Sequence, residues 1–211
     1  SMVRGGFFPA PTEEERRRRI EDNLALLNAT AELEAPMVVL VCGADPRVQL
    51  AEARKQVRAG IEAILPEAER LGIRLAIEPL HPVYADLRSV VNTMAQANDL
   101  CEAIAHPSLG VAVDVYHVWW DPELKQEIER CGKMGRIFAF HVCDWKTPPE
   151  DLLNDRGLMG EGCINIPLIR SWVEASGFSG FVEVEIFSHR YWSMDQDVYL
   201  GMIKKAWEEK V

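Results

Sequence analysis

The chain has 211 residues, is 48% hydrophobic and carries a formal net charge of −10, so it is long and apolar enough for one well-buried domain. The acidic balance argues against a nucleic-acid surface, and no stretch approaches the roughly 20 apolar residues of a membrane-spanning helix. We expect Ser1 and Met2 to be a remnant of tag removal and residues 3–211 to form a single domain. The five cysteines show no CxxC spacing, which predicts free thiols in a cytoplasmic protein.

Strand-like apolar runs alternate with helical patterns along the chain. The predicted strands begin at residues 3, 37, 74, 111, 137 and 181. The predicted helices cover residues 12–34, 49–71 with a kink or break at Pro66, 86–104, a short stretch after Pro122, 167–175 and 195–210. Residues 146–166 are irregular, which suggests an active-site lid. The alternation predicts an α/β fold, either a (β/α) barrel or an open parallel sheet, with six strands where a closed barrel has about eight.

Four of the predicted strands end in a side chain that can bind a metal ion. Side chains alternate along a strand, so in three of these strands an alanine shares the face of the polar residue. This pattern predicts an inner layer of small residues with a ring of carboxylates and one imidazole at its upper end. Such hard oxygen and nitrogen ligands at one level indicate a divalent-metal site. The four residues are Glu78, Asp114, His141 and Glu185.

These groups are suited to moving a proton next to a carbonyl. A metal bridging two substrate oxygens stabilises an enediolate, and Glu78 and Glu185 can remove the proton and return it. Epimerisation, aldose–ketose isomerisation and loss of water from the enediolate all remain open. A catalytically inactive barrel that binds metal or sugar is a further alternative, whereas a metal-dependent endonuclease would need more histidines than the five present.

The order of the motifs carries a resemblance to a known family. Ile-Glu-Pro-Leu (77–80), Asp-Val-Tyr-His (114–117), Phe-His-Val (140–142) and Glu-Ile-Phe (185–187), with Val-Asn-Thr (91–93), resemble the sugar isomerase/epimerase family of xylose-isomerase-like TIM barrels. The resemblance implies one Mn²⁺, Mg²⁺ or Zn²⁺ ion held by the four residues above, with the two glutamates as the proton-transfer pair. It also implies substrate contacts by His117 and by an arginine, matched here by Arg156.

Family members open with two further β/α units, so the chain resembles strands three to eight of an incomplete barrel. Two parallel edges would then need a cover, and we expect a homo-oligomer. The expected ligand is a small sugar or polyol, and no Gly-rich phosphate cradle stands out.

Other candidates for the substrate pocket follow the strand ends. His81 is a candidate pocket residue or an exposed loop histidine. Trp119 and Trp145 are candidates for the apolar wall behind a sugar, or they pack under the loops. His117 has an alternative role as the cap of a turn.

Overall fold

The structure is a computed structural model that describes residues 2–211, with side chains described from Gly5 onward. Ser1, half of the expected tag remnant, lies outside the described residues, and Met2 is the first residue of a strand.

Six parallel strands form one sheet whose spatial order follows the chain. Each strand pairs with the next one in the sequence, which is the order that successive β/α units give in a barrel. Within the described residues β1 and β6 each have one neighbour, so the sheet is open. The prediction of an incomplete (β/α) barrel is confirmed. The strands are β1 (Met2–Gly6), β2 (Met37–Val41), β3 (Arg74–Glu78), β4 (Leu109–Asp114), β5 (Ile137–Val142) and β6 (Val182–Val184).

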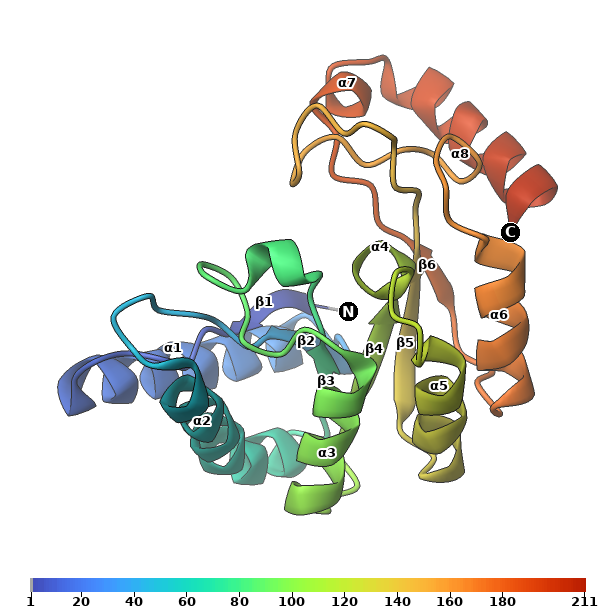
Figure 1. Cartoon of the computed structure of the whole chain (residues 1–211). Helices are drawn as coiled ribbons and strands as arrows, with labels where there is room; N and C mark the ends of the chain where they lie inside the picture. Colours follow the sequence, from blue (N-terminus) through green and yellow to red (C-terminus); the bar gives the residue numbers. More distant parts are fainter. Residues whose placement is uncertain (1) are drawn as a thin grey trace.

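The longer connecting helices lie along the outer side of this sheet, and the C-terminal part of the chain rises above the carboxyl ends of the strands (Figure 1). None of the described helices is both long and apolar enough to cross a membrane. The α-helices are α1 (Glu13–Glu32), α2 (Leu50–Arg70), α3 (Met94–Ile104), α4 (Val115–Val118), α5 (Leu124–Lys133), α6 (Ile166–Ala175), α7 (His189–Trp192) and α8 (Gln196–Lys210), with one 3-10 turn, η1 (Pro82–Tyr84).

The core divides into two layers because side chains alternate across the strands. Bulky residues such as Leu75, Ile77 and Phe140 pack outward against the helices. The inner face carries the predicted small residues Ala76, Ala112 and Ala139 in a separate buried cluster with Met37 and Val39. Each fully buried large aliphatic side chain contributes about 1.5–3 kcal/mol. The two layers hold the strand ends, and so the polar residues there, at fixed positions.

The start of α1 follows the predicted capping box. The Thr12 hydroxyl accepts a hydrogen bond from the Glu15 backbone N–H at 3.2 Å, and Glu15 Oε2 accepts one from the Thr12 backbone N–H at 3.3 Å. These two bonds satisfy donors that a helix start leaves unpaired.

The prediction of a break at Pro66 is wrong, because α2 continues through this residue to Arg70. Proline removes one helical hydrogen bond. The buried side chains on either side of it, among them Leu65 and Ala68, pack into the core and favour one continuous helix. A kink at Pro66, the other form of the prediction, stays a prediction.

The predicted helix over residues 86–104 is wrong in its first half, since α3 begins at Met94. Residues 85–88 form a turn, and the segment after it is tied to the end of β2: Ser89 forms a bridge with Gly43, and the Val90 N–H donates to the Gly43 carbonyl at 3.0 Å. Thr93 then caps α3. Burial of Val90 and Val91 outweighs the helical pattern of this stretch.

Candidate metal centre and substrate cavity

The four predicted ligands meet at the carboxyl ends of the strands. Glu78 is the last residue of β3 and Asp114 the last of β4, where it lies opposite His141 of β5. Strand β6 is shorter than predicted, yet the Glu185 N–H still donates to the Val142 carbonyl at 3.1 Å, which aligns Glu185 with the others. One ligand atom from each of the four residues lies within 4.8 Å of the other three. Their role as metal ligands stays a prediction.

Hydrogen bonds orient these side chains in a buried environment. His141 Nδ1 lies 3.2 Å from Glu78 Oε1. Asp114 Oδ1 accepts from the Tyr116 backbone N–H at 2.9 Å, so this carboxylate also caps the short helix α4. His141 Nε2 is buried and has no hydrogen-bond partner among the described residues. The cluster is therefore ordered but leaves a nitrogen lone pair or N–H unsatisfied.

The buried charges shift the pKa values of the cluster in different directions. Burial raises the pKa of Asp114 to about 8, against the opposing charge of Arg156. Burial also raises the pKa of Glu78, against its hydrogen bond with His141. For His141, burial favours the neutral ring, but Glu78 and the other carboxylates outweigh burial and raise the pKa to about 9. For Glu185, the positive charges of Arg156 and His141 outweigh burial and lower the pKa. The cluster therefore holds more protons than free side chains would.

Arg156 brings a buried positive charge to this cluster. Its Nη1 donates to Glu185 Oε2 at 2.8 Å and to Asp114 Oδ2 at 3.0 Å, and its Nη2 lies 3.2 Å from His117 Nε2. The guanidinium carbon lies 4.4 Å from the ring centre of Tyr116 and 4.8 Å from that of Phe187. Two carboxylates and two aromatic faces thus fix the predicted substrate-binding arginine.

His117 is buried beside Arg156, and its predicted contact with the substrate stays a prediction. Burial, followed by the charge of Arg156, lowers its pKa well below the ordinary value, so the ring is neutral. Its Nδ1 accepts from the His81 backbone N–H at 3.3 Å, which fixes the ring orientation.

The irregular segment of residues 146–165 is held to the sheet by one buried side chain. The carboxylate of Asp144 accepts hydrogen bonds from three backbone N–H groups, those of Trp145 (2.9 Å), Gly160 (2.9 Å) and Ile164 (3.0 Å). The backbones of Asp144 and Gly157 also exchange two hydrogen bonds. This anchor, which the sequence did not reveal, and the 3.0 Å hydrogen bond from the Arg156 backbone N–H to the Phe187 carbonyl together place Arg156 over the strand ends. The predicted lid function of the segment stays a prediction.

A cavity of about 150 Å³ opens above the cluster. Its lining combines the carboxylates of Glu78 and Glu185, the Arg156 guanidinium, apolar side chains and a second arginine, Arg88, from the loop before α3. Arg88 and Trp192 were not predicted, because the first lies in a segment with a helical pattern and the second in a helix of only four residues. The lining residues are Val41, Glu78, Leu80, Arg88, His117, Leu153, Asn154, Arg156, Glu185, Phe187 and Trp192.

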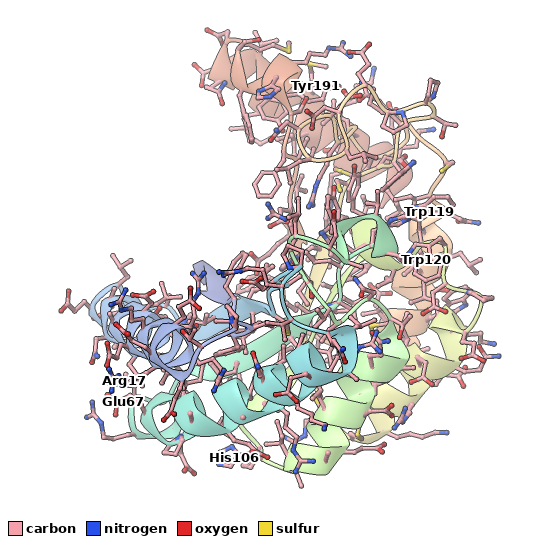
Figure 2. The ribbon with its side chains drawn as sticks, turned by 60° about the vertical axis from the view of Figure 1, so that its left-hand side comes forward. Arg17, Glu67, His106, Trp119, Trp120 and Tyr191 are labelled. Atoms are coloured by element: carbon pink, nitrogen blue, oxygen red, sulfur yellow. The ribbon has the colours of Figure 1, made fainter. Side chains whose placement is uncertain are left out.

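The other predicted pocket residues, His81, Trp119 and Trp145, do not line this cavity. They form an aromatic cluster beside it, in which the His81 and Trp145 rings stack with centres 4.7 Å apart and Trp145 lies 5.9 Å from Trp119. Figure 2 shows Trp119 and Trp120 together on one side of the molecule, below Tyr191. Packing under the loops, the alternative interpretation, accounts for their positions.

Comparison with known proteins agrees with this architecture. The family model described as xylose isomerase-like TIM barrel matches residues 2–209. The chain belongs to this family. The predicted resemblance is confirmed, and the match covers all six strands and the four polar strand ends.

Relatives within the xylose isomerase-like TIM barrel family are longer than this chain. An inosose isomerase of Halalkalibacterium halodurans is 24% identical over 209 residues, which are 97% of this chain and 72% of the relative. A crystal structure of a Sinorhizobium meliloti protein is 48% identical, with a TM-score of 0.94, 97% of this chain covered and 75% of the other. A structure of an IolI protein with bound zinc is 22% identical, with a TM-score of 0.83 and coverage of 97% and 74%.

Proposed function

We propose that the chain is a divalent-metal-dependent sugar isomerase or epimerase that moves a proton next to the carbonyl of a small sugar or polyol ketone. The observation that carries the proposal is the buried cluster of Glu78, Asp114, His141 and Glu185, with ligand atoms within 4.8 Å of one another. The inosose isomerase name of the relative supports a polyol ketone as substrate. A cavity of about 150 Å³ suits a small ligand, being below the roughly 300–1,000 Å³ of drug-sized pockets.

The residues present fit a divalent cation. Three carboxylates and an imidazole form a donor set suited to Mn²⁺, Mg²⁺ or Zn²⁺. His141 Nε2 is buried without a partner among the described residues, and burial raises the pKa values of Asp114 and Glu78, which a bound cation would oppose. The zinc in the related IolI structure supports a metal but leaves its identity in this chain open. A divalent ion held by these four residues would supply Lewis acidity at a substrate carbonyl oxygen.

The two glutamates have environments that suit opposite halves of a proton transfer. Arg156 and His141 keep Glu185 ionised, so we assign it the role of base. Glu78, whose Oε1 lies 3.2 Å from His141 Nδ1, is the second carboxylate of the cavity, so we assign it the return of a proton to the substrate. Neutral His117 and cationic Arg156 both line the cavity and would hold the substrate oxygens. Epimerisation or isomerisation follows from which carbon receives the proton.

Exchange of a substrate proton with solvent tests this function. We expect the metal-loaded chain to exchange the proton next to the carbonyl of an inosose or a ketohexose into D₂O. Exchange should be lost in Glu185→Gln at saturating metal, because the amide cannot accept the proton. The control Glu62→Gln removes an exposed carboxylate of α2 and should behave as wild type. Stoichiometric metal binding without exchange would favour a non-catalytic metal-binding protein instead.

We also propose that the chain self-associates and works in the cytoplasm. The outer strands β1 and β6 present backbone edges that a second copy could cover. The five cysteines are free and four of them are buried, which suits a reducing compartment. A light-scattering mass of one chain at micromolar concentration would count against self-association.

A further inference from the structure

Arg88 is a positive group that the proposed reaction does not use. It belongs to the loop between η1 and α3, and its backbone N–H donates to the Tyr84 carbonyl at 3.0 Å. The next residue, Ser89, is buried and bridged to Gly43, so the backbone around Arg88 is fixed. The side chain lines the same cavity as Glu78, and its guanidinium carbon lies 5.9 Å from the ring centre of Tyr84.

The charge of Arg88 has no carboxylate partner in the described part of the chain. Its guanidinium forms no ion pair there, whereas other arginines such as Arg47 and Arg130 pair with neighbouring acids at 2.7 Å. Within the cavity, the three carboxylates of the proposed centre are balanced by a divalent ion and Arg156. Arg88, which is half-buried, therefore adds to the cavity one positive charge that no carboxylate of the described residues pairs with.

The cavity wall strengthens this unbalanced charge. Leu80, Leu153, Phe187 and Trp192 provide apolar surface around the space that Arg88 lines. A charge–charge interaction is stronger in such surroundings than in open water, and a guanidinium suits the planar or tetrahedral oxygens of a carboxylate or phosphate. A neutral hydroxyl would use only one of its donors and none of its charge.

We propose that Arg88 forms an anion subsite, and that the substrate is a small sugar or polyol derivative bearing a carboxylate or a phosphate. This inference rests on the proposed function, which assigns the other end of the substrate to the metal centre and the two glutamates. Arg88 is not within ion-pair distance of Glu78 or Glu185, so the anionic group lies away from the carbon that exchanges its proton. The subsite adds an anionic group to the small sugar or polyol expected from the sequence, in which no Gly-rich phosphate cradle stands out.

Three probes on one carbon skeleton test the subsite by calorimetric titration of the metal-loaded chain: D-fructose, D-fructose 6-phosphate and D-fructuronate. We expect at least one anionic probe to bind roughly tenfold or more tightly than D-fructose, as a charge-assisted contact allows. The anionic group that binds more tightly, carboxylate or phosphate, identifies the class of substrate. Arg88→Gln should remove most of this advantage and change D-fructose binding less than about twofold. Arg88→Lys should retain part of it, because the charge remains.

Arg17→Gln is the matched control, since it removes the same charge from the exposed surface of α1, at the opposite end of the molecule from Tyr191 (Figure 2). Equal affinity of wild type for all three probes would overturn the subsite, as would equal losses in the Arg88 and Arg17 variants. Proton exchange measured on the same samples separates the two proposals. Arg88-dependent anion binding without exchange contradicts the isomerase, whereas exchange without anion preference contradicts the subsite alone.

Discussion

Asp144 offers a sharp test of how the site is built, through the variant Asp144→Asn. The carboxylate is fully buried and accepts three backbone hydrogen bonds of 2.9–3.0 Å, one from the adjacent Trp145 and two from Gly160 and Ile164 of the segment that carries Arg156. Asparagine has a similar shape but only one acceptor oxygen, and its NH₂ group would face a backbone N–H donor. The variant should therefore loosen the segment without emptying the core.

The expected loss follows from the three hydrogen bonds. A hydrogen bond to a charged group contributes about 1.5–3 kcal/mol, and such contributions within one network do not add fully. We expect Asp144→Asn to lower the free energy of unfolding by about 3 kcal/mol. Because the segment that carries Arg156 loosens, substrate affinity should fall as well, while the four metal-ligand candidates stay in place.

Urea denaturation followed by tryptophan fluorescence measures this loss, since Trp145 adjoins the anchor. The matched control is Asp151→Asn, in the same segment: Asp151 also accepts two backbone hydrogen bonds, from Leu153 and Asn154, but it is exposed. The urea midpoint of the Asp151→Asn variant should shift little from that of the wild type. Equal midpoints for the two variants would refute the assignment of Asp144 as the anchor of the segment.

Three further outcomes are expected. Ile77→Ala should cost about 2–5 kcal/mol in urea denaturation, because Ile77 is fully buried in the outer layer, and a cost below about 1 kcal/mol would contradict that packing. Gly162→Ala should destabilise the chain as well, because an added Cβ would lie 2.1 Å from the Trp145 carbonyl oxygen, and an unchanged melting temperature would show that the loop can yield. In the metal-free protein the pKa values of Asp114 (about 8) and His141 (about 9) lie above those of the unfolded chain, so the folded state binds more protons. Their contribution to stability is fully present below the ordinary pKa values of 3.8 for Asp114 and 6.5 for His141, and it falls as the pH rises from these values to about 8 and about 9. Melting curves recorded from about pH 6 to pH 9 should show this fall, and saturating Mn²⁺ should weaken it. A stability that rises over the same range would contradict these directions.

The sequence predicted the parts of the site that depend on strand periodicity. A buried strand has a period of two, so the small residues Ala76 and Ala112 and the polar residues two positions later had to share a face. Parallel order then brings strand ends to one edge of the sheet. For that reason strand periodicity alone is enough to place Glu78 and Asp114 together.

The parts that sequence reasoning missed depend on tertiary contacts. The path of residues 146–165 is set by backbone donors that converge on Asp144, which no local pattern reveals. Arg88 was assigned to a helix because burial of Val90 and Val91 against β2 could not be foreseen. Helices α4 and α7 have four residues each, too few for a helical period to be recognised. The lining of the cavity depends on the path of residues 146–165, on the loop that carries Arg88 and on these short helices, so it could not be predicted from the sequence.

The central claim is that four strand-end side chains hold one divalent ion. Titration of the metal-free chain with Mn²⁺, read out by calorimetry and by metal content after desalting, tests it most directly. The account predicts one ion per chain for wild type and for His106→Gln, whose histidine lies at the far end of the molecule from Tyr191 (Figure 2). Asp114→Asn and His141→Gln should each weaken binding by more than about tenfold, since even residues that only support a ligand cost this much. Unchanged binding in both variants would contradict the claim.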